Sequence, residues 1–158
     1  MIAMALAEKP SLLIADEPTT ALDVTTQAQV LKMMRALMNE VNASILLITH
    51  DLAVASQVAD QVVVMYAGDV VEDADVLDLF SEPLHPYTQG LLACIPSGFK
   101  DEGQIEPIPG RLPDNRNPPQ GCKFVERCPH AMEICSRKRP RLLEPKPNHR
   151  VACFLYGE

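Results

Sequence analysis

The sequence predicts an α/β fold, with a parallel sheet and flanking helices in the first part of the chain and an irregular, cysteine-rich C-terminal extension after it. Two short aliphatic runs, Leu12–Ala15 and Ile45–Ile48, have the length and composition of strands buried on both faces of a sheet. The segment between them has the apolar spacing of one amphipathic helix. Ten of the 14 prolines and four of the five cysteines stand at or after Pro96, which indicates a change of organisation there.

Composition limits the class of protein. Of the 158 residues, 47% are apolar but only 4% are aromatic, so the core is expected to be aliphatic. The longest unbroken apolar stretch, Met1–Ala7, is far shorter than the roughly 20 residues of a membrane-spanning helix, and it lacks the features of a secretion signal. We therefore do not expect a membrane-spanning protein. The net charge is −10 over residues 1–95 and +3 over residues 96–158, where the bases are mixed with acids, so no nucleic-acid partner is expected.

The first 60 residues predict a βαβ unit. Met1–Glu8 is helix-like and ends before Pro10, because the residue before a proline avoids the helical region. A second helix is predicted from about Val24 to Glu40, with Asp23 as its N-cap. Its apolar stripe consists of Val24, Ala28, Leu31, Met34, Met38 and Val41. The strands on either side of this helix are expected to be parallel, with a right-handed crossover.

Shorter elements follow this unit. Gln61–Tyr66 and Asp69–Glu72 predict a hairpin that turns at Ala67-Gly68. Asp73–Phe80 and Pro86–Ala93 predict two short helices, the second with its proline in the first turn. From Pro96 onward there is little periodicity, and the prolines exclude long helices.

Glycine usage excludes two kinds of nucleotide site from the first part of the chain. The first glycine is Gly68. The 67 residues before it therefore contain neither a Gly-rich phosphate loop nor a dinucleotide-binding fingerprint, because both need glycine where the backbone approaches a phosphate.

Two carboxylates, Asp16 and Glu17, follow the first strand directly. In open α/β sheets ligands bind at the carboxyl ends of the strands. There one carboxylate can hold a hydrated Mg²⁺ and the other can polarise a water for attack on a phosphate. The alternative is a solvated loop in which Asp16 or Thr19 caps a turn, and the residue pair alone leaves both interpretations open.

A longer string around these residues resembles a known family. Leu12–Asp23, with the sequence LLIADEPTTALD, is similar to the Walker B motif and D-loop of ABC transporter ATPases. Ile45–Ile48 followed by Thr49-His50-Asp51 resembles the strand and switch-histidine loop of the same family, in the same order and at a similar separation. The resemblance implies a partial P-loop NTPase sheet of the ABC type, with ATP and Mg²⁺ as ligands, in which Met1–Ala7 is the helix after the signature motif.

The resemblance also implies roles for four residues. Asp16 would coordinate Mg²⁺, Glu17 would position the attacking water, Asp23 would lie at the contact between two nucleotide-binding subunits, and His50 would contact the γ-phosphate. Without the resemblance, His50 is more simply an N-terminal helix residue beside a capping Thr49.

The segment Glu82–Leu92, with the sequence EPLHPYTQGLL, resembles the His-Pro-Tyr-Thr element of the oligopeptide/dipeptide/nickel importer branch of these ATPases. His85 is expected to pack or to form hydrogen bonds rather than to bind a ligand, because no metal-ligating residue is spaced beside it.

Four cysteines of the extension, Cys122, Cys128, Cys135 and Cys153, allow three interpretations. Disulfides are disfavoured if the protein is cytosolic, a structural zinc site usually has tighter spacing, and an iron–sulfur cluster tolerates irregular spacing. The surrounding sequence, from Pro119 to Pro129 and from His149 to Cys153, is similar to the C-terminal extension of the dipeptide/oligopeptide ATPases. This resemblance implies a four-iron, four-sulfur cluster on the four cysteines, with Zn²⁺ as the alternative.

Together these resemblances imply the C-terminal part of an ATP-binding subunit of an ABC importer for di- or oligopeptides. Residues 1–80 would be the C-terminal part of the nucleotide-binding domain and residues 81–158 the transporter-specific extension. The implied partners are a second ABC ATPase subunit, membrane-spanning permease subunits and, indirectly, an extracellular or periplasmic substrate-binding protein. The implied location is cytoplasmic, on the inner face of the membrane.

Two further expectations concern activity. Because the phosphate-binding loop and the signature motif are missing from this sequence, the chain by itself is expected not to hydrolyse ATP. The alternative function is a non-catalytic iron–sulfur or zinc module, with a regulatory or binding role, attached to a truncated chain that cannot hydrolyse ATP.

Overall fold

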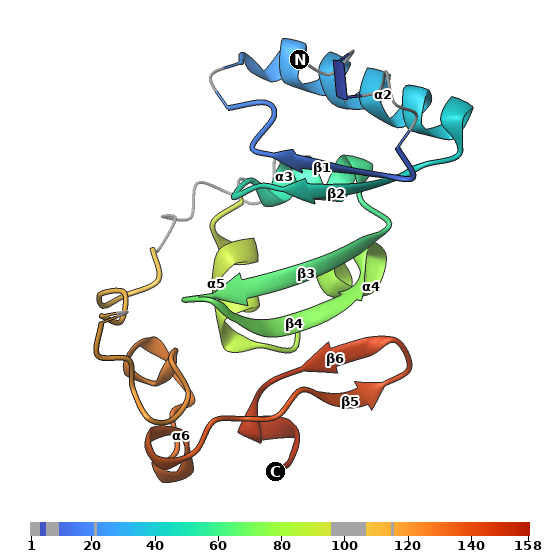
Figure 1. Cartoon of the computed structure of the whole chain (residues 1–158). Helices are drawn as coiled ribbons and strands as arrows, with labels where there is room; N and C mark the ends of the chain where they lie inside the picture. Colours follow the sequence, from blue (N-terminus) through green and yellow to red (C-terminus); the bar gives the residue numbers. More distant parts are fainter. Residues whose placement is uncertain (1–3, 6–9, 21, 96–106, 115) are drawn as a thin grey trace. The chain divides into compact units, whose positions relative to one another are not determined.

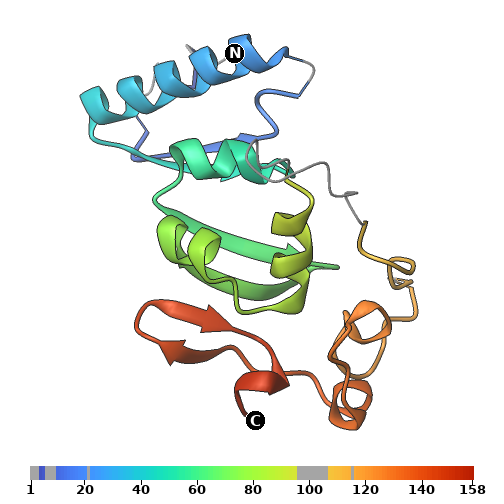
Figure 2. The same ribbon diagram turned by 180° about the vertical axis from the view of Figure 1, so that it is seen from behind.

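The computed structural model describes residues 4–5, 10–20, 22–95, 107–114 and 116–158. The chain forms two compact units, Met1–Ala59 and Asp60–Glu158, shown from two sides in Figures 1 and 2. Most of the predicted helix Met1–Glu8 lies outside the described residues. The two residues of this segment that the structure describes, Met4 and Ala5, are helical. Within the described ranges, no helix combines the length and the apolar character needed to cross a membrane.

The first unit confirms the predicted βαβ arrangement. Its elements in chain order are β1 (Leu12–Asp16), α2 (Val24–Val41), β2 (Ser44–Ile48) and α3 (Leu52–Val58). β1 and β2 pair in parallel, from Leu12 opposite Ser44 to Asp16 opposite Ile48. The carboxyl ends of both strands therefore lie at the same edge of the sheet, and Asp16-Glu17 and Thr49-His50 leave the sheet side by side.

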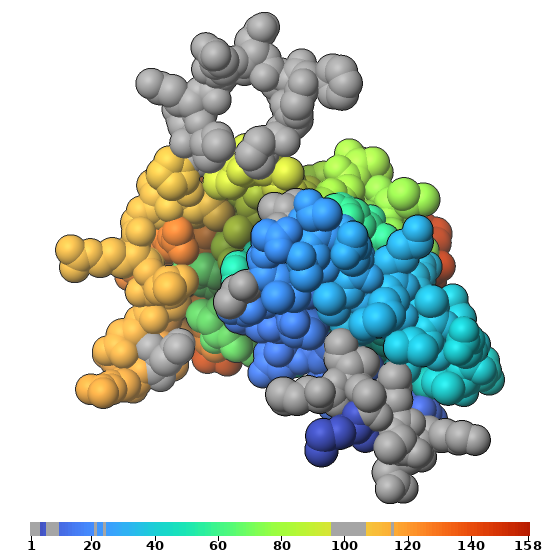
Figure 3. Space-filling model, turned by 90° about the horizontal axis from the view of Figure 1, so that it is seen from above, coloured from blue at the N-terminus to red at the C-terminus, as the bar shows by residue number. Residues whose placement is uncertain are grey.

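Helix α2 is capped as the sequence predicts. The Asp23 carboxylate accepts hydrogen bonds from the Thr26 backbone N–H at 3.0 Å and from the Thr26 hydroxyl at 2.6 Å. At the other end Asn42 adopts a left-handed conformation, with φ at 53°, and closes the helix. Met34 and Met38 are buried against Leu13 and Ala15 of β1. In Figure 3 the atoms of α2, coloured blue to cyan, lie at the surface that faces the viewer.

One face of the β1–β2 sheet is open, which corrects the expectation of strands buried on both faces. Leu12 and Ile14 of β1 and Leu46 and Ile48 of β2 are all exposed. α2 covers the opposite face, where Leu13 and Ala15 are buried. Alternate residues of a strand point to opposite faces, so one helix can bury only half of these aliphatic side chains.

The second unit is built on a four-stranded antiparallel sheet in the order β3-β4-β6-β5. β3 (Gln61–Tyr66) and β4 (Asp69–Asp75) form the predicted hairpin, and both turn residues, Ala67 and Gly68, have positive φ. β5 (Leu143–Lys146) and β6 (His149–Val151) form a second hairpin, which joins the first through Glu72 opposite Val151 and Asp73 opposite Arg150.

This sheet changes two sequence-based expectations. Asp73–Asp75 continue strand β4 instead of starting a helix, because their backbones pair with β3 and β6, and α4 begins only at Val76 (Val76–Ser81). The extension is also less irregular than predicted. Its two short strands complete the sheet, and it contains α6 (Glu133–Arg137) and two 3₁₀ turns, Val125–Arg127 and Phe154–Tyr156.

Helix α5 (Pro86–Ala93) forms where the sequence predicts it. Pro86 occupies the first turn and His85 is the N-cap. Tyr87 of this helix packs edge-on against Tyr66 of β3, with ring centroids 4.7 Å apart, and both rings contact Phe124 from the extension. This aromatic cluster connects the hairpin, the His-Pro-Tyr element and the cysteine-bearing segment in one core.

Candidate functional site

The first candidate site lies at the carboxyl ends of β1 and β2. The His50 Nδ1 atom is 2.9 Å from the Glu17 Oε1 atom, although the two residues are 33 positions apart in the sequence. The Thr20 hydroxyl donates a hydrogen bond of 2.9 Å to Glu17 Oε2. The structure thus brings together two of the residues that the motifs predicted.

The Glu17 backbone is unusual at this position. Its φ is 44°, a left-handed conformation that costs energy for a non-glycine residue. Its N–H donates to the Ile48 carbonyl at 2.9 Å, and its carbonyl accepts from the Thr20 N–H at 3.1 Å. These two bonds fix the turn after β1, so the carboxylate is presented at the edge of the sheet and not along the strand.

Electrostatics keep this carboxylate ionised. The hydrogen bond from His50, followed by the one from Thr20, lowers the pKa of Glu17 below its ordinary value. An ionised carboxylate accepts hydrogen bonds only, so Glu17 can accept one from a water molecule. Because both side chains are exposed, a ligand can reach them from solvent.

Within the described residues, no side-chain hydrogen bond or ion pair joins Asp16 or Asp23, the other two predicted site residues of this unit, to the Glu17–His50 pair. Asp16 is the exposed last residue of β1, next to Glu17 in the chain. Asp23 caps α2, and its bonds with Thr26 lower the pKa of its carboxyl group. A carboxylate capped in this way can still contact a second protein, because Asp23 is exposed.

The second candidate site is a cavity in the second unit that all four predicted cysteines line. Cys122, Cys128, Cys135 and Cys153 surround it together with His85 and His130. The four sulfur atoms are near enough for every pair of them to interact electrostatically. The enclosed space is about 20 Å³, enough for one water molecule, so any larger group would require the sulfur atoms to move outward.

Three of these cysteines share a local geometry. Each accepts a hydrogen bond at sulfur from the backbone N–H two residues later: Cys122 from Phe124, Cys128 from His130 and Cys153 from Leu155. An N–H group that points at sulfur stabilises a thiolate more than a thiol. The three turns therefore favour the form of cysteine that binds metals.

Burial has the opposite effect and favours the neutral thiol when no metal is bound. It raises the pKa of Cys122 to about 11 and also raises the pKa of Cys128 and of Cys153. None of the five cysteines forms a disulfide. The raised pKa values keep the Cys122, Cys128 and Cys153 thiols protonated at neutral pH, and a cation in the cavity would be needed to hold them as thiolates.

Gly121 permits the close approach of the two chain segments that carry these cysteines. The Cys122 N–H donates to the Cys135 carbonyl at 2.7 Å. A Cβ atom at position 121 would lie 2.1 Å from that same carbonyl oxygen, far inside van der Waals contact. Only glycine fits here, a constraint that the sequence did not reveal because its partner is 14 residues away.

The described part of the chain contains no group of three or more His, Cys, Asp or Glu side chains arranged to hold a single metal ion. One zinc ion would need all of its sulfur ligands at about 2.3 Å. The four cysteines are thus gathered around one cavity without being at single-ion distances.

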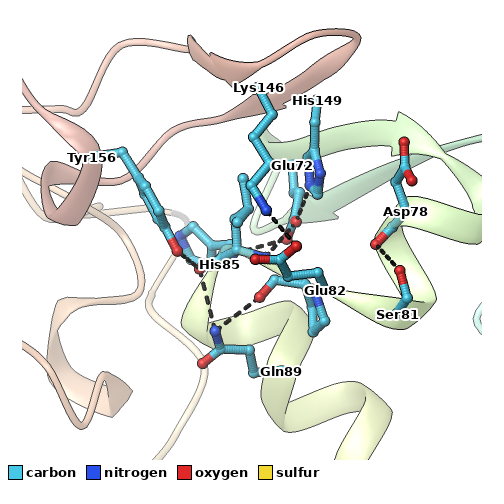
Figure 4. Close-up of polar contacts among 11 residues, drawn as sticks. Glu72, Asp78, Ser81, Glu82, His85, Gln89, Lys146, His149 and Tyr156 are labelled. Atoms are coloured by element: carbon cyan, nitrogen blue, oxygen red, sulfur yellow. Dashed lines mark hydrogen bonds and ion pairs between the residues drawn. The ribbon is translucent and has the colours of Figure 1, made fainter.

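A buried carboxylate, which sequence reasoning missed, supports the wall of this cavity (Figure 4). Glu72 of β4 is completely buried and accepts hydrogen bonds from the backbone N–H groups of Leu84 at 2.7 Å and His85 at 2.9 Å. The His149 Nε2 atom lies 2.7 Å from the same carboxylate. Nothing in the sequence marks Glu72, because its partners are 12, 13 and 77 residues away.

Comparison with known proteins points to transport ATP-binding proteins. The family described as "Oligopeptide/dipeptide transporter, C-terminal region" matches residues 71–135. The oligopeptide transport ATP-binding protein AppD of Bacillus subtilis (strain 168) is 57% identical over 158 residues, which are 100% of this chain and 48% of that protein. OppD of Escherichia coli (strain K12), also an oligopeptide transport ATP-binding protein, is 50% identical over 154 residues, 98% of this chain and 45% of that protein. The dipeptide transport ATP-binding protein DppD of Bacillus subtilis (strain 168) is 48% identical over 158 residues, 100% of this chain and 47% of that protein.

The chain matches the C-terminal half of these ATP-binding proteins. It spans about half the length of the curated relatives that it matches. The family-typical region, residues 71–135, contains Glu72, the His-Pro-Tyr element and three of the four cysteines that line the cavity. The recognised resemblance is therefore confirmed.

Proposed function

We propose that this chain is the C-terminal part of an ATP-binding subunit that drives a di- or oligopeptide ABC importer. The observation that carries the proposal is the contact between Glu17 and His50 at the carboxyl ends of adjacent parallel strands. The names of relatives such as AppD and DppD, oligopeptide and dipeptide transport ATP-binding proteins that match this chain over about half of their length, support it.

In this proposal four residues take part in nucleotide chemistry. Asp16 coordinates Mg²⁺, which supplies the positive charge that phosphoryl transfer requires. Glu17 holds the attacking water, and His50 both orients Glu17 and contacts the γ-phosphate. Asp23 lies at the contact with a second ATP-binding subunit, where its exposed position leaves it accessible.

The same proposal covers fold, partners and location. Residues 1–80 would be the end of an ABC-type P-loop NTPase domain and residues 81–158 the cysteine-rich extension. The open aliphatic face of β1 and β2 would pack against the rest of that domain. The partners would be a second ATPase subunit, permease subunits in the membrane and a substrate-binding protein outside it, with this subunit on the cytoplasmic face.

The test uses a chimera in which the preceding half of AppD is joined to this chain. A general base contributes about 10²- to 10⁴-fold to turnover, so Glu17→Gln should reduce ATP hydrolysis by at least about 100-fold. Glu40→Gln, an exposed glutamate at the end of α2, is the matched control and should keep full activity. Equal activity of the Glu17→Gln chimera and the parent would contradict the proposal.

The 158-residue chain alone provides a second measurement. Its sequence has no Gly-rich loop to hold the β- and γ-phosphates, so we expect no ATP turnover from it. A rate near ~1 s⁻¹, which is ordinary for an enzyme, would show that the phosphates are held by other groups.

We also propose that Cys122, Cys128, Cys135 and Cys153 hold an iron–sulfur cluster, with a zinc site or a regulatory binding module as the alternative. The three N–H···S turns and the shared cavity support thiolate ligation. Metal–thiolate bonds would supply folding energy to a loop-rich segment.

Anaerobic purification followed by iron, sulfide and zinc analysis tests this second proposal. A four-iron, four-sulfur cluster predicts about four iron and four sulfide per chain. Cys122→Ser should remove them, whereas Cys94→Ser, outside the cavity, should not. Stoichiometric zinc without iron, or iron that survives in Cys122→Ser, would contradict the cluster.

A further inference from the structure

His85 of the His-Pro-Tyr element is one of the side chains that line the cysteine cavity. It is 2% exposed, and its ring packs against Phe124, which lies between Cys122 and Cys128 in the chain. Neither ATP chemistry nor metal ligation, as proposed above, gives this histidine a role. Its place in the lining of the cavity suggests one.

The two ring nitrogens of His85 have different surroundings. Nδ1 accepts a hydrogen bond of 3.0 Å from the Tyr87 backbone N–H, as the N-cap of α5. An acceptor nitrogen carries no proton, so a neutral imidazole places its proton on Nε2. No group in the described ranges accepts a hydrogen bond from Nε2.

The backbone around His85 is held firmly. Glu72 accepts the N–H groups of both Leu84 and His85, and the Tyr156 hydroxyl donates to the Leu84 carbonyl at 3.0 Å (Figure 4). Through His149 the same Glu72 carboxylate holds strand β6, which leads into Cys153. The wall that presents His85 and the strand that presents one cysteine are therefore fixed by one buried group.

We propose that His85 donates its Nε2–H hydrogen bond to a sulfur atom at the four-cysteine site and thereby tunes that site. The inference rests on the iron–sulfur site proposed above. One-electron reduction adds a negative charge to such a site, and a hydrogen bond to its sulfur stabilises the more negative form. His85 acts through its hydrogen bond to sulfur and does not bind the metal itself.

The variant His85→Asn separates this role from helix capping. Asparagine is a good N-cap residue and keeps an acceptor for the Tyr87 N–H, but its side chain is shorter and withdraws the donor from the cavity. Dithionite titration followed by electron paramagnetic resonance should give a lower midpoint potential than the parent. We expect about a tenfold change in the reduction equilibrium, which is 59 mV for one electron. Gln120→Asn is the control, because Gln120 is exposed and does not line the cavity, and it should leave the potential unchanged.

The iron content separates the two proposals. A parent chain without iron overturns the iron–sulfur site and this inference together. A parent and a His85→Asn variant with equal iron and equal potential overturn this inference alone. If His85→Asn loses iron, pulsed electron paramagnetic resonance of the reduced parent, labelled with ¹⁵N-histidine, decides instead. A ¹⁵N coupling that persists in His130→Asn supports the hydrogen bond, and the lack of any coupling overturns it.

Discussion

Glu17 and Glu72 each contact a histidine that is distant in the sequence, yet their surroundings are opposite. In the pair of Glu17 and His50 the side chains are 44% and 77% exposed, whereas Glu72 and His149 are 0% and 2% exposed. An exposed pair is screened by water and contributes little to stability, so it remains available for a ligand. A buried carboxylate must have all of its partners, and Glu72 uses them to join β4, the His-Pro-Tyr element and β6. We propose a chemical role for the first glutamate, whereas the second joins three segments of the second unit.

Removal of the buried carboxylate should have the largest effect on stability. Glu72→Ala leaves the Leu84 and His85 N–H groups and the His149 ring without their acceptor, which should cost about 3–5 kcal/mol of unfolding free energy. All three tyrosines lie in the second unit, so tyrosine fluorescence during urea unfolding reports on that unit. Glu126→Ala, which changes an exposed glutamate of the same unit, is the control and should have little effect. Equal urea midpoints for Glu72→Ala and Glu126→Ala would show that the buried contacts of Glu72 do not stabilise the second unit.

The sequence distance between interacting residues explains which features could be predicted from the sequence. Leu12–Asp16, the α2 N-cap and the Ala67-Gly68 turn depend on neighbours within a few residues, and these elements were predicted almost to the residue. The strand character of Asp73 depends in part on Arg150 of β6, 77 residues later, and was missed. Glu72 and Gly121 were missed for the same reason, since their partners come together only in the folded unit.

Gly121→Ala should have a smaller but distinct effect. The added methyl group would meet the Cys135 carbonyl oxygen at 2.1 Å, so the segments that carry Cys122 and Cys135 must separate. Overpacking of this kind costs about 1–3 kcal/mol. The variant should also lose bound iron, because the Cys122 N–H bond to Cys135 breaks. Full iron content and an unchanged urea midpoint would show that the cysteine segments do not depend on this contact.

The smallest expected effect is at the exposed pair, where only proton binding should change. The hydrogen bond from His50 is the largest cause of the lowered pKa of Glu17, so His50→Ala should raise that pKa toward its ordinary value. Because the folded pKa is lowered, the contact contributes to stability above the unfolded pKa of about 4.5, and the contribution is lost as pH falls through the folded pKa. The side-chain carboxyl resonance of Glu17, followed by NMR between pH 2 and 7, measures the shift. Asp23, whose pKa is lowered by Thr26 and not by His50, is the internal reference and should titrate identically in both proteins. If Glu17 also titrates identically, the contact with His50 is not maintained in solution, and the strand-end site loses the geometry on which the proposed water-positioning role depends.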